Sequence, residues 1–195
     1  MGREFELKYR CTAEAFAAIQ AAYAEFTPIE METTYYDTFD GRLSNLHWTL
    51  RRRMENGKSI CTLKTPAPDG SRREWEVECG SIMGAIPALC QAGAPMELMR
   101  LSISGLGAVC GAKFTRLAKT LELPGATVEL ALDRGVLTGG GREMQLQEVE
   151  VELKAGSDNA AIAFAKLLME QYHLIPEQRS KYRRALGLAR GEYDV

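Results

Sequence analysis

Polar and apolar residues alternate along much of the chain, with the period of two that a β-strand with two different faces produces. Over residues 4–10, charged side chains fall on one face, while Phe5, Leu7 and Tyr9 fall on the other. The same alternation or a high β-propensity predicts further strands, over residues 33–38, 48–54, 58–65, 72–78, 113–121, 126–133 and 142–154. The pattern therefore predicts a large sheet with one charged face.

Helices and turns are expected between these strands. Thr12 is a predicted N-cap for a helix over 13–26, and Ser157 is one for a helix over 159–172. Residues 81–111 are rich in Ala, Met, Leu and Gly, and they predict two or three short helices outside the sheet. A turn or short helix is expected over 43–47, hairpin turns at 56–57 and 139–141, and a short element over 180–188. We interpret residues 1–195 as a single domain.

The charged strand faces are predicted to line a tunnel. Apolar helix stripes, such as the one containing Phe164 and Leu168, must be buried against something, and the apolar strand faces are the available partners. The charged faces then lie on the opposite side of the sheet. An open sheet would present them as a zwitterionic surface, but a closed barrel would leave no unprotected edges. The expected fold is α+β, with a closed barrel and helices outside it.

Crowded charges of both signs in a tunnel need ligands of both signs. The pairs Glu4/Glu6 and Glu150/Glu152 would repel each other without a cation, and their hard oxygen ligands suit Mg²⁺ or Mn²⁺. The arginines and lysines on the inward faces need an anion, and guanidinium groups bind phosphate oxygens well. A compact polyanion with a metal ion, such as a triphosphate, satisfies both sets.

Composition narrows the function classes. The chain has 195 residues and a formal charge of -2, which argues against a protein that coats nucleic acid. No stretch has the length and apolarity of a membrane helix, and no signal peptide is expected. The five cysteines include no CxxC pair and indicate free thiols in a reducing cytoplasm. A P-loop is absent, so a triphosphate would have to be bound in another way.

Several segments together resemble the triphosphate tunnel metalloenzymes, also called CYTH proteins. The segment Glu4-Phe5-Glu6-Leu7-Lys8 is similar to the ExExK signature of that family. The supporting segments follow in the order of the family: 35–38, 50–53, 62–64, 72–77, 131–135, 148–153 and Ser180-Lys181. The resemblance covers nearly the whole chain. It implies an eight-stranded antiparallel barrel with helices packed outside.

The resemblance also implies roles for individual residues. The implied metal ligands are Glu4, Glu6, Glu148, Glu150 and Glu152. The implied substrate-binding residues are Lys8, Arg51, Arg53, Lys64, Arg72, Arg116 and Lys181. Lys8, Tyr35 and Lys64 are the implied catalytic residues. Arg52 is expected to point outward by alternation. Relatives often carry a basic residue where this chain has Ala118, which weakens the phosphate clamp locally or passes the role to Lys119.

The layout most resembles the bacterial inorganic triphosphatases. The resemblance implies a cytoplasmic enzyme that hydrolyses inorganic triphosphate to phosphate and pyrophosphate, as a monomer or homodimer, without nucleic-acid or membrane partners. The alternatives are a thiamine or nucleoside triphosphatase, a class IV adenylyl cyclase, and a non-catalytic polyphosphate-binding module.

Overall fold

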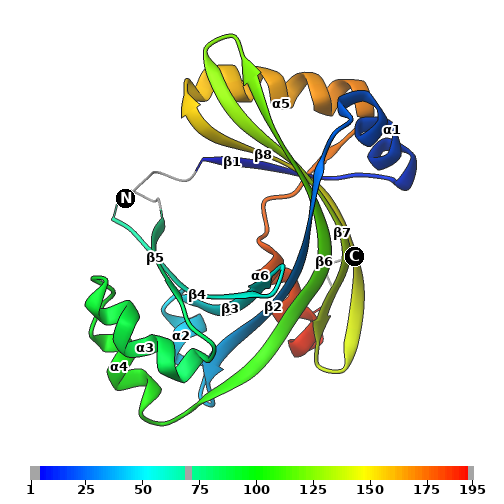
Figure 1. Cartoon of the computed structure of the whole chain (residues 1–195). Coiled ribbons are helices and arrows are strands. Elements are labelled where there is room, and N and C mark those ends of the chain that lie inside the picture. The colour runs from blue at the N-terminus through cyan, green and yellow to red at the C-terminus, as the bar shows by residue number, and fades with distance from the viewer. Residues whose placement is uncertain (1–4, 69–71, 193–195) are drawn as a thin grey trace.

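A single curved antiparallel sheet organises the protein (Figure 1). The computed structural model describes residues 5–68 and 72–192. Within these ranges the strands pair in the order β5-β4-β3-β2-β6-β7-β8-β1-β9. Their bounds are β1 Glu6–Arg10, β2 Thr27–Thr38, β3 Thr49–Glu55, β4 Lys58–Pro66, β5 Arg72–Glu78, β6 Leu106–Leu123, β7 Ala126–Gly139, β8 Arg142–Gly156 and β9 Ile175–Pro176. No described helix is both long and apolar enough to cross a membrane.

The prediction of a closed eight-stranded barrel is wrong. Among the described residues, the sheet has nine strands, and β5 and β9 are its two unpaired edges. A closed sheet would leave no unprotected edges, but both edges of this open sheet are protected in other ways. The five-residue β1 pairs with β8 along one edge, and Ile175 and Pro176 of β9 cover part of its other edge. Proline offers no N–H for further pairing. The edge strand β5 is short and rich in charged side chains.

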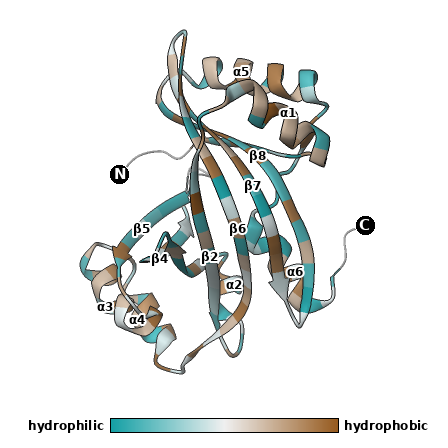
Figure 2. Ribbon diagram, turned by 45° about the vertical axis from the view of Figure 1, so that its right-hand side comes forward, coloured by the Kyte–Doolittle hydropathy of each residue, from teal (hydrophilic) through white to brown (hydrophobic). Residues whose placement is uncertain are grey.

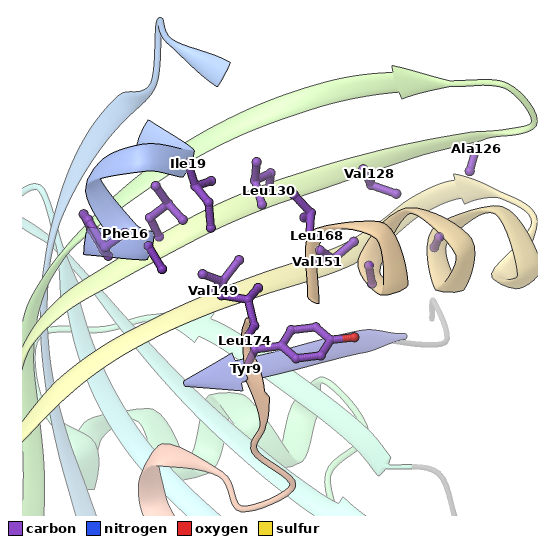
Figure 3. Close-up of a cluster of buried hydrophobic side chains, with 14 residues drawn as sticks. Tyr9, Phe16, Ile19, Ala126, Val128, Leu130, Val149, Val151, Leu168 and Leu174 are labelled. Carbon is purple, nitrogen blue, oxygen red and sulfur yellow. The ribbon is translucent and has the colours of Figure 1, made fainter. Parts of the chain in front are cut away.

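One end of the outer face is covered by α1 (Ala13–Tyr23) and α5 (Asp158–Tyr172). Their apolar residues pack on β1, β7 and β8, and Figure 3 shows this cluster, which includes Phe16, Ile19, Val149, Val151 and Leu168. The side chain of Thr12 accepts a hydrogen bond from the N–H of Ala15, which confirms the predicted N-cap of α1. The expected packing of apolar helix stripes on apolar strand faces is thus confirmed here.

The other end of the outer face is covered by α3 (Ile82–Gln91) and α4 (Glu97–Ser102), with the short α2 (Arg42–Asn45) beside them. These helices bury Leu50, Leu63 and Trp75 from β3, β4 and β5. Residues 106–111 were expected to belong to this helical region, but they begin β6. Their Gly and Ala content favours neither structure strongly, and pairing with β2 makes them a strand. Figure 2 shows the alternation of hydrophobic and hydrophilic residues along β2, β6, β7 and β8.

The last helix, α6 (Lys181–Arg190), lies on the inner face of the sheet. Its residues Ala185 and Leu188 pack with Leu137 and Leu146, which share the inner faces of β7 and β8 with the charged residues. The approach is close, because a Cβ added at Gly139 would lie 2.3 Å from the backbone oxygen of Ala185. The prediction that all helices pack outside is therefore wrong for α6, which covers part of the inner face.

Candidate active site

The inner face of the sheet encloses a cavity of about 690 Å³. Residues of every strand except β9 line it, together with the start of α6. All seven basic residues predicted to bind substrate line this cavity: Lys8, Arg51, Arg53, Lys64, Arg72, Arg116 and Lys181. For Lys8, Arg51, Arg53, Lys64 and Arg72, which lie on strands, the inward face agrees with the alternation of the sequence although the sheet is open.

Two arginines of β3 that line the cavity have unsatisfied donors. The Nε atoms of Arg51 and Arg53 are buried and have no hydrogen-bond partner among the described residues. Burial lowers the pKa of Arg53, and the neighbouring charge of Arg51 acts in the same direction. The neighbouring Arg52 points to the outer face, where its Nε donates to the hydroxyl of Ser59 at 2.9 Å. This difference confirms the predicted register of β3 and leaves two inward guanidinium groups suited to an anion.

The wall formed by β4 and β5 mixes charges of both signs. The ammonium of Lys64 lies 3.0 Å from one carboxylate oxygen of Glu74, and the other oxygen of Glu74 lies 3.7 Å from a guanidinium nitrogen of Arg51. Arg72 donates to the hydroxyl of Thr49 at 3.1 Å, which fixes this guanidinium at the side of the cavity. These contacts position the basic groups along the wall of the cavity.

A network of buried charges lies beneath the cavity. The Lys181 ammonium is 2.8 Å from a carboxylate oxygen of Asp133, 2.7 Å from one of Glu148 and 2.6 Å from one of Glu150. Arg116 binds both oxygens of Asp133 at 2.8 Å and also contacts Glu150. Although burial opposes ionisation, the charges of Lys181 and Arg116 hold the pKa of Glu150 well below its usual value.

The ammonium of Lys181 stands where a metal ion would otherwise bind these three carboxylates. Asp133, Glu148 and Glu150 bring ligand oxygens within 4.8 Å of one another, which alone would suit a cation. Glu148 is fully buried, does not line the cavity, and is paired with both Lys181 and Arg184. The geometry gives Glu148 basic partners within the protein, and its role as a metal ligand stays a prediction.

A second group of carboxylates fits a divalent cation better. Glu6 of β1 lies opposite Glu152 of β8, which lies opposite Glu129 of β7, and all three side chains line the cavity. Directly opposed like charges repel each other. Burial, together with the charge of Glu150, raises the pKa of Glu6 to about 7. Several carboxylate oxygens in a row are the ligands that Mg²⁺ and Mn²⁺ prefer. The predicted ligand Glu4 lies outside the described residues.

The remaining predicted residues occupy different surroundings. Tyr35 lines the inner end of the cavity, with its ring 5.0 Å from that of Tyr182, and burial raises the pKa of its hydroxyl. Lys119 turns away from the cavity and donates to the backbone oxygens of Tyr23 and Ala24 at 2.7 and 3.1 Å. Lys119 therefore caps the end of α1 and does not supply the charge that Ala118 lacks.

Sequence reasoning missed several residues of the site. Asp133 and Glu129 were visible on the inward face of β7, but only the sheet register brings them beside Arg116 and Glu152. Arg184 is three residues after Lys181, a spacing that places both side chains on one side of a helix. That spacing is the only signal that could have linked Arg184 to the buried network.

Comparison with known proteins places the chain in a family. Residues 2–186 match the CYTH domain. An inorganic triphosphatase from Haemophilus influenzae is 26% identical over 200 residues, which cover 99% of this chain and 57% of that protein. The chain therefore spans little more than half the length of that relative.

Two solved structures share the fold. A candidate adenylate cyclase from Bacillus halodurans is 21% identical, with a TM-score of 0.63, over 94% of this chain and 98% of that chain. A Hippeastrum candidate adenylyl cyclase with a dominant triphosphatase activity is 17% identical, with a TM-score of 0.67, over 98% of this chain and 97% of that chain. At these identities the two structures bear on the fold alone.

Proposed function

The chain belongs to the CYTH domain family, and from this premise we propose that it is a metal-dependent triphosphatase acting on a small triphosphate. The observation that carries the proposal is the gathering of basic side chains around one charged cavity, among them Arg51 and Arg53, whose buried Nε atoms have no partner among the described residues. A buried donor without a partner is costly, so a bound polyanion would stabilise both groups.

Inorganic triphosphate is the proposed substrate. Three aromatic residues line the cavity, Tyr35, Phe114 and Tyr182, and two of them are buried too deeply for a nucleobase to stack on them. Tyr35 is 4% exposed and packs against Tyr182, and Phe114 is 6% exposed with the Lys181 ammonium 5.3 Å from its ring centre. The rest of the lining is mainly charged. These features favour a ligand that consists of phosphoryl groups alone.

The proposed reaction is attack of water on a terminal phosphorus, with cleavage of the bond to the pyrophosphate leaving group. Arg51, Arg53 and Lys8 bind phosphoryl oxygens and orient the chain in line for attack. Lys64 stabilises the charge that develops on the leaving oxygen. The raised pKa of Tyr35 keeps its hydroxyl protonated, so it can donate a hydrogen bond there. A divalent cation held by Glu6, Glu129 and Glu152 would neutralise phosphoryl charge when bound.

The proposal is tested with purified protein and a substrate panel. We expect phosphate release from inorganic triphosphate with Mg²⁺ or Mn²⁺, slower or no release from ATP and thiamine triphosphate, and none after addition of EDTA. Formation of cyclic AMP from ATP would favour a cyclase. Tight binding of triphosphate without any turnover would favour a binding module. Full turnover in EDTA would contradict the metal site.

The two orientations on β3 provide a direct test of the phosphate clamp. Arg53→Ala is expected to weaken triphosphate binding by roughly 10- to 150-fold, the worth of a charge-assisted hydrogen bond of about 1.5–3 kcal/mol. Arg52→Ala is the matched control, because Arg52 contacts Ser59 on the other face of the sheet. Titration calorimetry measures both. Equal losses in the two variants would contradict the assignment of Arg53 to the substrate.

A further inference from the structure

Lys154 lies at an irregular point of β8, where the pairing with β7 shifts by one residue. Val128 of β7 is opposite Leu153 of β8. The preceding residue, Thr127, is opposite Ala155, so the pairing passes over Lys154. A bulge of this kind bends the strand and redirects a side chain. The side chain of Lys154 lines the cavity, so the bulge places a flexible ammonium group at the wall that β7 and β8 form.

The ammonium of Lys154 is paired with two of the carboxylates proposed to bind the divalent cation. It lies 2.9 Å from an oxygen of Glu152 and 3.7 Å from an oxygen of Glu129. These two residues are directly opposite each other on neighbouring strands, and like charges in that arrangement repel each other. One positive charge beside both carboxylates lowers this repulsion. Lys154 therefore competes with a cation for the same two oxygens.

Lys154 is held less firmly than the other lysine that pairs with carboxylates of the sheet, Lys181. The ammonium of Lys181 contacts three carboxylates at 2.8, 2.7 and 2.6 Å, and its side chain is 12% exposed. The side chain of Lys154 is 40% exposed. Ion pairs of partly exposed groups are weak, and the stem of a lysine is flexible. A divalent cation, with twice the charge, can therefore displace Lys154 while Lys181 stays in place.

We propose that Lys154 is the resident counter-ion of the cation site, and that a divalent cation displaces its ammonium from Glu129 and Glu152 on binding. This inference rests on the proposed function, which assigns the cation to these carboxylates. In the ion-free protein, Lys154 compensates the two opposed negative charges. Each cation that binds has to replace this compensation, so Lys154 lowers the affinity of the site and sets the ion concentration at which it fills.

The test measures binding of Mn²⁺ to the ion-free protein by titration calorimetry, without substrate. Lys154→Met removes the competing charge, so we expect it to bind Mn²⁺ about threefold to tenfold more tightly than wild type. Lys154→Arg keeps the charge and should bind as wild type does. Lys166→Met is the matched control for the change in net charge, because Lys166 lies on α5 and pairs with Glu170 at 3.8 Å. Its affinity should equal that of wild type.

Thermal melting separates displacement from a structural role. In EDTA, Lys154→Met should melt below wild type, because the opposed carboxylates lose their counter-ion. At saturating Mn²⁺ the two proteins should melt at the same temperature, since the cation then supplies the compensation in both. A difference that persists at saturating Mn²⁺ would overturn the inference.

Two results of the calorimetry would also overturn the inference. One is an Mn²⁺ affinity of Lys154→Met that is equal to or weaker than that of wild type. The other is an equal gain in Lys166→Met, which would reduce the effect to net charge. Wild-type protein that binds Mn²⁺ without hydrolysing triphosphate would overturn the proposed enzyme activity, while the comparison of Mn²⁺ affinities would still decide the role of Lys154.

Discussion

Replacement of Arg184 by methionine is expected to lower the free energy of unfolding by about 3–5 kcal/mol. Arg184 is buried and its guanidinium pairs with Glu148, which is fully buried. Removing one partner leaves the other charge buried with less compensation, and this cost exceeds the net contribution of the pair itself. Methionine keeps much of the volume, so the loss would not arise mainly from a cavity. Urea unfolding monitored by circular dichroism measures the effect.

Arg183→Met is the matched control for this experiment. Arg183 is exposed and is the neighbouring residue of the same helix, so it shares the helical propensity and the change in net charge. We expect its effect to stay within about 0.5 kcal/mol, as for most surface substitutions. A double variant with Glu148→Gln should recover part of the loss. Similar losses for Arg183→Met and Arg184→Met would show that the buried pair has no special role.

Glu152→Gln is expected to lower kcat/KM for triphosphate by about a hundredfold or more, because it removes one charged ligand from the proposed cation site. The fold should survive, since among the described residues the carboxylate makes an ion pair with the partly exposed Lys154, and pairs of this kind contribute little. Glu6→Gln should behave in the same way, because Glu6 lies opposite Glu152. Steady-state phosphate release over a range of Mg²⁺ concentrations measures the loss.

Glu143→Gln provides the control on the same strand, because Glu143 is exposed near the start of β8. Its kcat/KM should equal that of the wild type. Calorimetric titration with Mn²⁺ in the absence of substrate gives a second measurement, in which Glu152→Gln should bind the ion more weakly. Wild-type activity and ion binding in both Glu6→Gln and Glu152→Gln would exclude these two carboxylates as ligands of the cation.

Alternation along the strands identified which residues face inward. It distinguished Arg51 and Arg53 from Arg52, because a side chain two positions along a strand returns to the same face. The structure agrees, since the first two line the cavity and Arg52 contacts Ser59 outside it. The alternation of side chains along a strand depends only on local backbone geometry. It therefore indicates the inward-facing residues even though the sheet does not close.

Alternation does not indicate which inward-facing residues are covered by other parts of the chain. Glu148 and Glu150 are equivalent by pattern, yet Glu150 lines the cavity and Glu148 lies beneath α6 with Arg184. The difference arises from packing between segments that are far apart in the sequence. The same limit explains why the closed barrel was wrong, since closure depends on whether two distant edges meet. Residues 106–111 were also misassigned. Their composition favours neither helix nor strand strongly, and the strand with which they pair, β2, lies far away in the sequence.

The pairing of β1 with β8 has a consequence for how the protein folds. Lys8 and Glu150 face each other across these strands although they are 142 positions apart in the sequence. Contacts of such long range require the closure of a large loop, and they are associated with slow folding. The wall that carries Glu6 and Lys8 is therefore assembled only when distant parts of the chain have found each other. Detachment of this short strand would remove Glu6 and Lys8 from the cavity together, so we expect opening of β1 to release a bound ligand.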